Sequence, residues 1–323
     1  WNLALELDSA TEAPRGLLMT THTAVLVTGA SRGFGRALAM QMAARWPQKL
    51  TIVLAASSSE GLQETATLLV NARVKTGVKN LEESMAVSVA AVDMRDLPAV
   101  EAWAQTAMDV LQAGKPSRVI LVNNAGTVGD LGTVAELRDW QSVQKNLDLN
   151  VTSCMSLTAE FTRRFGAPRS DRAAAKELPR PEAFVINVSS LAALEPFQTW
   201  GNYCVTKAAR EMFHRVLAQE QAHCDTFHVL NYAPGPMDTD MQAQIRNSHG
   251  VFQPLREAGM QAFDEGNLVT PLESAEMLLR LIDDHEFTSG AHFDYFDGLP
   301  EDEEDDGDEA EEKKHPDIVE QSR

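Results

Sequence analysis

Short apolar runs rich in β-branched residues alternate with longer helical stretches from residue 24 to about residue 296. Seven of these runs have the length of buried strands: Ala24–Thr28, Leu50–Ala55, Ala86–Val92, Arg118–Val122, Ala183–Val188, Thr226–Leu230 and Ala291–Phe293. The clearest helical stretches between them are Gly35–Trp46, Leu97–Ala113, Gly201–Gln221 and Pro271–Asp283. Near-continuous apolar strands separated by helices are typical of a parallel sheet that is covered on both faces. The pattern therefore predicts a doubly wound α/β fold of three layers, with a mostly parallel seven-stranded sheet.

No internal repeat and no linker rich in Pro, Gly or Ser divides this alternating region. Residues 23–299 are therefore predicted to form one domain. Two polar stretches, Asn71–Ser84 and Gly166–Pro181, are expected to be surface insertions. Residues 1–22 show no pattern that joins the domain. They are expected to be a disordered or non-native leader, with Met19 as a candidate natural start.

The formal net charge of −19 is concentrated toward the carboxyl end. Residues 300–323 hold 12 acidic and 3 basic side chains, a net of −9 that leaves −10 for the rest of the chain. Such a self-repelling segment predicts an acidic disordered tail. An acidic chain lacks the basic footprint that nucleic-acid binding needs, and no apolar run approaches the length of a membrane span. The three cysteines have no metal-site spacing and are expected to be reduced thiols, which indicates a cytoplasmic protein.

The segment Thr28–Gly35 follows the first predicted strand directly and opens a helix. Its glycines are Gly29, Gly33 and Gly35. A dinucleotide turn needs a tight bend, close approach of the backbone to a pyrophosphate and anion contact at the helix N-terminus. An ordinary glycine-rich turn is the alternative, but the position between a strand and a helix favours a Rossmann-type dinucleotide site.

The end of the second strand distinguishes the two nicotinamide dinucleotides. An NAD site places an acidic side chain there to hold the ribose 2′-hydroxyl, but this strand ends in Ala56, Ser57 and Ser58, with no acid before Glu60. Arg32, inside the glycine turn, is a planar cation that suits a 2′-phosphate. A solvated loop arginine is the alternative. The sequence therefore predicts NADPH/NADP as the cofactor.

Tyr203 and Lys207 are four residues apart and so lie on one face of a predicted helix. A tyrosine has a pKa near 10, and an ammonium group one turn away is expected to lower that pKa toward neutrality. Ser190, at the end of the fifth strand, is positioned to donate to a substrate carbonyl. Together these residues indicate proton transfer to a carbonyl oxygen.

The glycine turn, the Asn-Asn-Ala-Gly turn that ends at Gly126, Asn150, Ser190 and the Tyr203/Lys207 pair resemble the short-chain dehydrogenase/reductase family. The resemblance implies a Ser–Tyr–Lys triad, with Asn150 holding a proton-relay water and a nicotinamide supplying hydride. It also implies a homodimer packed through the helices that carry Asn150 and Tyr203.

Three longer motifs, Ser189–Phe197, Asn231–Met241 and Ser289–Asp294, resemble the sepiapterin reductase group of that family. This likeness covers about residues 24–296 and implies reduction of side-chain carbonyls on a pterin, in tetrahydrobiopterin biosynthesis. Asp294 matches the carboxylate that anchors the pterin ring, although a surface carboxylate is the alternative. Ser57 departs from the group, which tends to carry arginine there.

Two other functions remain open on the same fold. One is a carbonyl or diketone reductase with a non-pterin substrate, and Asp294 argues against it. The other is a catalytically silent NADPH sensor, which the intact Ser190/Tyr203/Lys207 set disfavours.

Individual site residues can be assigned from these motifs. No metal is expected in the site. The catalytic residues are Asn150, Ser190, Tyr203 and Lys207. The cofactor is expected to contact Gly29, Ser31, Arg32, Gly33, Phe34, Gly35, Ser57, Ser58, Asp93, Met94, Asn124, Ala125, Gly126, Tyr203, Lys207, Pro234, Gly235, Met237, Thr239 and Met241. A small pterin or ketone is expected to contact Ser190, Leu191, Trp200, Tyr203, Gly235, Met241 and Asp294, with packing in the core as the alternative for Trp200.

Overall fold

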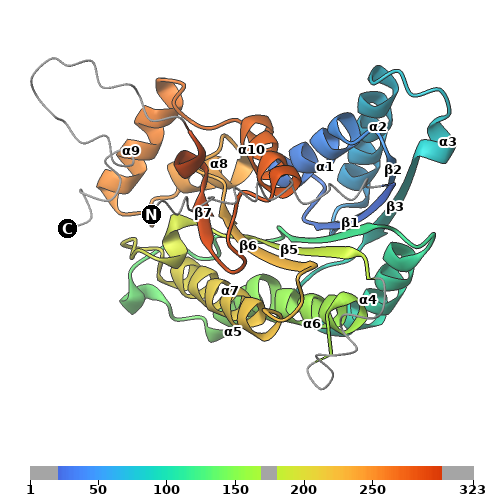
Figure 1. The fold of residues 1–323 in the computed structure, drawn as a ribbon. Helices are drawn as coiled ribbons and strands as arrows, with labels where there is room; N and C mark the ends of the chain where they lie inside the picture. Colours follow the sequence, from blue (N-terminus) through green and yellow to red (C-terminus); the bar gives the residue numbers. More distant parts are fainter. Residues whose placement is uncertain (1–20, 169–179, 300–323) are drawn as a thin grey trace, which may run out of the picture.

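A computed structural model describes residues 21–168 and 180–299. Its centre is a seven-stranded sheet in the order β3-β2-β1-β4-β5-β6-β7, and every neighbouring pair of strands is parallel (Figure 1). The strands are β1 His22–Thr28, β2 Lys49–Ala56, β3 Met85–Ala91, β4 Arg118–Asn123, β5 Glu182–Val188, β6 Phe227–Ala233 and β7 His292–Asp294. The predicted fold class is confirmed, and each of the seven predicted strands is present.

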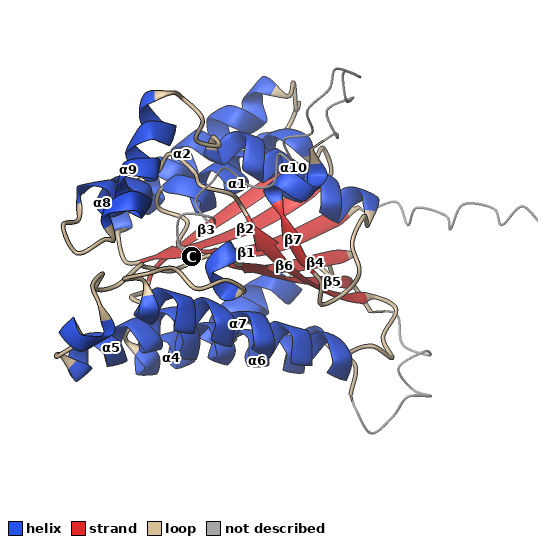
Figure 2. Cartoon of the chain, turned by 90° about the vertical axis from the view of Figure 1, so that its left-hand side faces the viewer, coloured by secondary structure: helices blue, strands red, loops and turns tan. Residues whose placement is uncertain are grey.

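Helices cover both faces of the sheet. Figure 2 shows α1, α2 and α10 on one side and α4, α5, α6 and α7 on the other. The helices are α1 Gly33–Arg45, α2 Ser59–Lys75, α3 Leu81–Ser84, α4 Leu97–Gln112, α5 Trp140–Leu147, α6 Ser153–Phe165, α7 Gly201–Glu220, α8 Asp240–Asn247, α9 Gln253–Asp264 and α10 Pro271–Asp284. Within the described part of the chain, no helix combines the length and apolarity needed to cross a membrane.

The alternation of side chains along each strand produces two cores, one on each face. In β1, Val25 and Val27 pack into the core under α1, α2 and α10. Their neighbours Ala24 and Leu26 pack into the other core, under α4, α6 and α7. All four side chains are fully buried. Because a buried valine or leucine side chain contributes about 1.5–3 kcal/mol, both faces of the sheet hold the layers together.

One predicted surface insertion lies mostly at the surface, but part of it is helical. The stretch Asn71–Ser84 begins inside α2, which continues to Lys75, and it ends with the short helix α3. Arg73 is fully buried, and its guanidinium donates to the carbonyl oxygens of Gln48, at 2.7 Å, and Ser84, at 3.1 Å. The five donors of arginine can satisfy several loop carbonyls at once, so this polar residue belongs to the core. Of the other predicted insertion, residues 169–179 lie outside the described residues, as do residues 1–20 of the leader and the tail at 300–323.

The strand order places a crevice at the carboxyl ends of β1 and β4. From β1 the chain builds outward through β2 to β3, and from β4 it builds outward in the opposite direction to β7. Open α/β sheets bind their ligands at such a reversal of strand order. The fold therefore brings together the loops that follow the strands, which carry nearly all the predicted site residues.

Candidate active site

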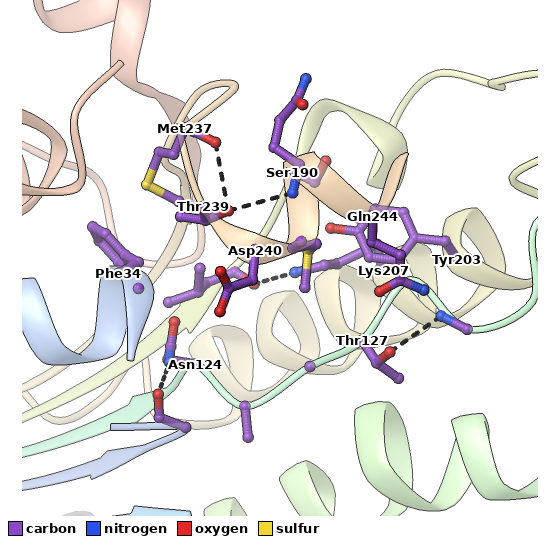
Figure 3. A pocket seen from close by; sticks show the side chains of 18 of the residues that line it. Phe34, Asn124, Thr127, Ser190, Tyr203, Lys207, Met237, Thr239, Asp240 and Gln244 are labelled. Carbon is purple, nitrogen blue, oxygen red and sulfur yellow. Dashed lines mark hydrogen bonds between the residues drawn. The ribbon is translucent and has the colours of Figure 1, made fainter. Parts of the chain in front are cut away.

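A cavity of about 820 Å³ opens at the carboxyl ends of the strands. This volume is in the range of ligand sites in proteins. In Figure 3, Phe34 and Asn124 lie toward one end of the cavity, and Tyr203 and Lys207 lie toward the other. The predicted residues that line it are Gly29, Ser31, Arg32, Gly33, Phe34, Ser57, Asp93, Met94, Asn124, Ala125, Gly126, Ser190, Leu191, Trp200, Tyr203, Lys207, Pro234, Gly235, Met237, Thr239, Met241 and Asp294.

Three predicted site residues lie outside this lining, each with a structural contact instead. Gly35 is packed in the turn: a Cβ there would lie 2.5 Å from the Gly29 carbonyl oxygen. The Ser58 hydroxyl accepts a hydrogen bond from the Gly61 N–H at 3.1 Å and caps α2. Asn150 is buried behind the cavity. Their predicted direct contacts with ligand stay predictions.

The glycine turn after β1 is held by the turn after β4. The Asn124 side-chain amide donates to the carbonyl oxygens of Thr28, at 2.8 Å, and Gly29, at 3.1 Å. Gly29 has a φ of +67°, and a Cβ there would lie 2.9 Å from the Ala125 Cα. The residue must therefore be glycine. Asn124 was expected to present its amide to the cofactor, but the structure uses that amide to fix the turn.

The first turn of α1 and its surroundings suit a dinucleotide phosphate. Arg32 occupies the N-cap position of α1, and its side chain does not cap the helix. Gly33 and Phe34, in the first turn of α1, line the cavity, and the N–H groups of a first helical turn can bind an anion. The donor set fits the predicted cofactor class.

Arg32 already has a partner in this structure. Its Nη1 donates to Asp240 Oδ2 at 2.6 Å, and both side chains are largely exposed. Asp240 begins α8, so this ion pair joins the glycine turn to the segment after β6 across the cavity. This pairing could not be predicted from local sequence because the two residues are 208 positions apart.

Asp93 follows β3 and keeps its charge. The Arg95 guanidinium hydrogen-bonds to both carboxylate oxygens at 2.8–3.1 Å. These bonds hold the pKa of Asp93 below its usual value. The ionised carboxylate lines the cavity as a hydrogen-bond acceptor.

Tyr203, Lys207 and Ser190 come together where α7 passes the end of β5. The Tyr203 hydroxyl is hydrogen-bonded with Ser190, and Lys207 Nζ lies 5.5 Å from the centre of the Tyr203 ring. Lys207 Nζ also donates to the carbonyl oxygens of Val188, at 2.7 Å, and Ser189, at 3.3 Å. Lysine and serine are therefore anchored to the same strand end that the tyrosine faces.

The pKa values of the pair differ from the expectation based on spacing. Burial raises the pKa of Tyr203 to about 12, and the bond with Ser190 offsets only part of that rise. Burial, and then the nearby Arg210, hold the pKa of Lys207 well below its ordinary value. The expected lowering of the tyrosine pKa is therefore wrong, because desolvation outweighs the Ser190 hydrogen bond and the charge of Arg210. Tyr203 is protonated at neutral pH and suits proton donation.

Tyrosinate absorbance should reveal this raised pKa. A tyrosine with a pKa of about 12 is roughly 1% ionised at pH 10, whereas one with an ordinary pKa is about half ionised. We expect the unmodified protein and the Tyr203→Phe variant to show the same tyrosinate absorbance at pH 10. An excess of about half an equivalent in the unmodified protein would contradict this environment for Tyr203.

The Asn150 side chain has a structural role in this structure, because its hydrogen bonds join neighbouring segments. It lies in a single π-helical turn between α5 and α6, and its side chain bonds to the backbone N–H and carbonyl of Thr127 at 2.9 and 2.8 Å. It also donates to Asn146 at 2.9 Å and Thr206 at 3.0 Å. Asn146 lines the cavity, and its buried Nδ2 has no hydrogen-bond partner among the described residues. The sequence could have predicted Asn146 as a site residue, because it lies one helical turn before Asn150.

Two charged residues of α7 were missed by the sequence reasoning. Arg210 is fully buried and donates to Asn187 Oδ1 at 2.8 Å and to the Ala125 carbonyl at 3.0 Å. Glu211 is also buried; it accepts from the Ser189 hydroxyl at 2.6 Å and lies 3.2 Å from His292 Nδ1. Arg210 thus fixes the turn after β4, and Glu211 joins the ends of β5 and β7.

Two aromatic rings and one buried carboxylate are among the groups that line the cavity. Trp200 stacks on Phe197, with 5.3 Å between ring centres, and meets the edge of Tyr203 at 5.9 Å. It both packs against neighbouring side chains and lines the cavity. Asp294 is 6% exposed, and its Oδ1 accepts from the Phe296 N–H at 3.1 Å. A cavity lined by a buried carboxylate and by aromatic rings suits a planar heterocycle that carries donors.

Comparisons with known proteins show the family of the chain. Residues 23–250 match the short chain dehydrogenase family. The chain is 37% identical over 273 residues to sepiapterin reductase of Xenopus laevis, which covers 84% of this chain and 95% of that protein. It is 28% identical over 273 residues to a benzil reductase ((S)-benzoin forming) of Bacillus subtilis (strain 168), over 81% of this chain and 98% of that protein.

A solved structure shows the same fold at lower sequence identity. It is 3-ketoacyl-(acyl-carrier-protein) reductase from Brucella melitensis complexed with NADH, with a TM-score of 0.62, 22% identity, and coverage of 85% of this chain and 96% of that one. Family match, fold and site geometry lead to one conclusion: the chain belongs to the short-chain dehydrogenase/reductase family of nicotinamide-dependent oxidoreductases, as a relative of the sepiapterin reductases.

Proposed function

We propose that this protein reduces a side-chain carbonyl of a pterin with NADPH, a reaction of tetrahydrobiopterin biosynthesis. The observation that carries the proposal is that the buried carboxylate of Asp294 lines the same cavity as Ser190 and Tyr203. A pterin presents an amino-pyrimidinone edge rich in hydrogen-bond donors, and one ionised carboxylate can accept two of them. The identity to sepiapterin reductase supports this substrate class.

Each catalytic side chain has a distinct role in the proposal. A bound nicotinamide supplies the hydride. The Tyr203 hydroxyl gives its proton to the substrate carbonyl oxygen, and Ser190 donates a hydrogen bond to that oxygen. Lys207 holds the ribose hydroxyls, and Asn150 supports the proton relay behind the cavity. The protonated state of Tyr203 at neutral pH supports its role as the acid.

NADPH is the proposed cofactor because Arg32 lies at the cavity mouth and no acidic residue ends β2. We expect NADPH to bind at least about tenfold more tightly than NADH, or ~1.4 kcal/mol, and Arg32→Ala to remove most of that difference. Asp240 competes with a 2′-phosphate for Arg32. Asp240→Asn should therefore tighten NADPH binding by about twofold to fivefold, the size of an exposed ion pair, and leave NADH binding nearly unchanged.

Calorimetric titration of both cofactors into the three proteins checks this prediction. Equal affinity of the unmodified protein for NADPH and NADH would refute the role of Arg32. An Asp240→Asn variant that binds NADPH more weakly would show that Asp240 contributes to the site in another way.

The benzil reductase relative supports a second candidate, a reductase of simple diketones. Such a substrate has no pterin edge and would leave Asp294 without a role in recognition. Comparison of kcat/KM for sepiapterin and benzil tests the two functions directly.

We further propose that the protein is a homodimer and that it is cytoplasmic. Val205, Met212 and Val216 are exposed apolar residues on one face of α7, which supports a homodimer packed through this helix and α5–α6. The three cysteines are free thiols in this structure, which supports a cytoplasmic location. We also propose residues 23–299 as the single reductase domain.

A further inference from the structure

Two histidines and a glutamate meet at the amino ends of the strands, at the opposite end of the sheet from the cavity. Glu182 is the first residue of β5, His228 is the second of β6, and His285 follows the last residue of α10. Glu182 Oε1 lies 3.1 Å from His285 Nε2 and 3.9 Å from His228 Nε2. One ligand atom from each of the three side chains lies within 4.8 Å of the other two.

These separations fit one small divalent cation. Zinc bonds of about 2.0–2.2 Å in a tetrahedral arrangement place neighbouring ligand atoms roughly 3.3–3.5 Å apart. The two separations from Glu182 Oε1 lie on either side of that value, and all three ligand atoms lie within 4.8 Å of one another, so side-chain rotation could bring them to one cation. Two imidazoles and one carboxylate are also a ligand set that zinc accepts, with a water in the fourth position.

The surrounding side chains orient the three ligands. Arg118 Nε donates to Glu182 Oε2 at 2.9 Å, which leaves Oε1 facing the imidazoles. Arg118 is held in turn by Asp283, at 3.2 Å. This is the kind of outer support that fixes a metal-bound carboxylate.

His285 has an unusual backbone for a non-glycine residue. Its φ is +55° at the C-cap of α10, a conformation that asparagine also tolerates. Its side chain is 41% exposed, so solvent and ions can reach the group from outside.

We propose that Glu182, His228 and His285 form a zinc site that joins β5, β6 and α10 at the end of the domain remote from the cavity. Neither the family resemblance nor the proposed reaction assigns a role to these residues. The site is open on one side, where the His285 side chain is 41% exposed, and it lies next to the cationic Arg118. Bound zinc stabilises the fold, because it binds the native arrangement and not the unfolded chain.

Thermal unfolding of the full chain with added ZnCl₂ gives the first measurement. At zinc concentrations about a hundredfold above Kd, the Tm should rise by roughly 5 °C. His228→Asn and His285→Asn should each weaken zinc binding by at least about tenfold, since even outer-shell changes cost about 10–100-fold. Asparagine keeps the positive φ at position 285, which protects folding. His249→Asn, an exposed histidine outside the cluster, is the matched control and should bind zinc as the unmodified protein does.

Co²⁺ titration identifies the ligands. The proposal expects one equivalent of Co²⁺ to give visible bands of a four-coordinate centre, without the near-ultraviolet band of a thiolate ligand. The visible bands should disappear in His285→Asn, while NADPH binding stays unchanged. A thiolate band, or a zinc-induced Tm shift that survives in both variants, would overturn the proposal. So would no binding at all, which would leave Glu182 and His285 as an ordinary ion pair.

Discussion

Tyr203→Phe is expected to lower kcat by about a hundredfold to ten-thousandfold on every carbonyl substrate, the usual contribution of a positioned general acid. The change removes only the hydroxyl that is hydrogen-bonded with Ser190. The ring keeps its contact with Trp200 and its position above Lys207, so NADPH should bind with nearly unchanged affinity. Steady-state rates and a fluorescence titration with NADPH measure the two effects separately.

Tyr295→Phe is the matched control for this variant. Tyr295 precedes Phe296 at the carboxyl end of the domain and is not among the residues that line the cavity. Its loss of a hydroxyl should leave kcat within about twofold of the unmodified protein. A Tyr203→Phe variant that keeps more than a tenth of the activity would show that another group delivers the proton.

The strand pattern predicted most of the fold, and the glycine turn predicted the cofactor end of the site. Strands such as β1 are buried on both faces, so their apolar residues are continuous and easy to recognise. Motifs that follow strands, such as Gly29–Gly35 and Asn123–Gly126, lie close in space because parallel strands end at one edge of the sheet. Local sequence was sufficient wherever topology alone brings the residues together.

Features that depend on burial could not be predicted in the same way. Three charged helical residues, Arg73, Arg210 and Glu211, resemble solvent-exposed positions in the sequence. All three are buried, and their polar groups form hydrogen bonds with residues distant in the sequence. The raised pKa of Tyr203 has the same origin, because the sequence shows the neighbouring lysine but not the desolvation. Pairs such as Arg32 and Asp240 are joined only by the folded chain.

Asp294→Asn is expected to lower kcat/KM for sepiapterin by about tenfold to a hundredfold. Asparagine keeps an oxygen that can accept from the Phe296 N–H, but it removes the charge that the pterin donors need. Hydrogen bonds to a charged group contribute about 1.5–3 kcal/mol, and each 1.4 kcal/mol is a factor of about ten. Benzil has no such donors, so its kcat/KM should hardly change.

Asp297→Asn provides a control of the same chemistry three residues away. Asp297 accepts from the Asp294 N–H at 2.8 Å, and it is not among the residues that line the cavity. Asparagine can keep that bond, so both substrates should be reduced at nearly the original rate. A loss of sepiapterin activity in Asp297→Asn equal to that in Asp294→Asn would attribute the effect to local folding.

The most direct test of a pterin reductase is the ratio of kcat/KM for sepiapterin to kcat/KM for benzil, measured by NADPH oxidation. The account predicts that the unmodified protein favours sepiapterin and that Asp294→Asn lowers the ratio by about tenfold to a hundredfold, while Asp297→Asn leaves it in place. A protein that favours benzil, or a ratio that does not move when Asp294 loses its charge, would contradict the account and identify a reductase of simple diketones.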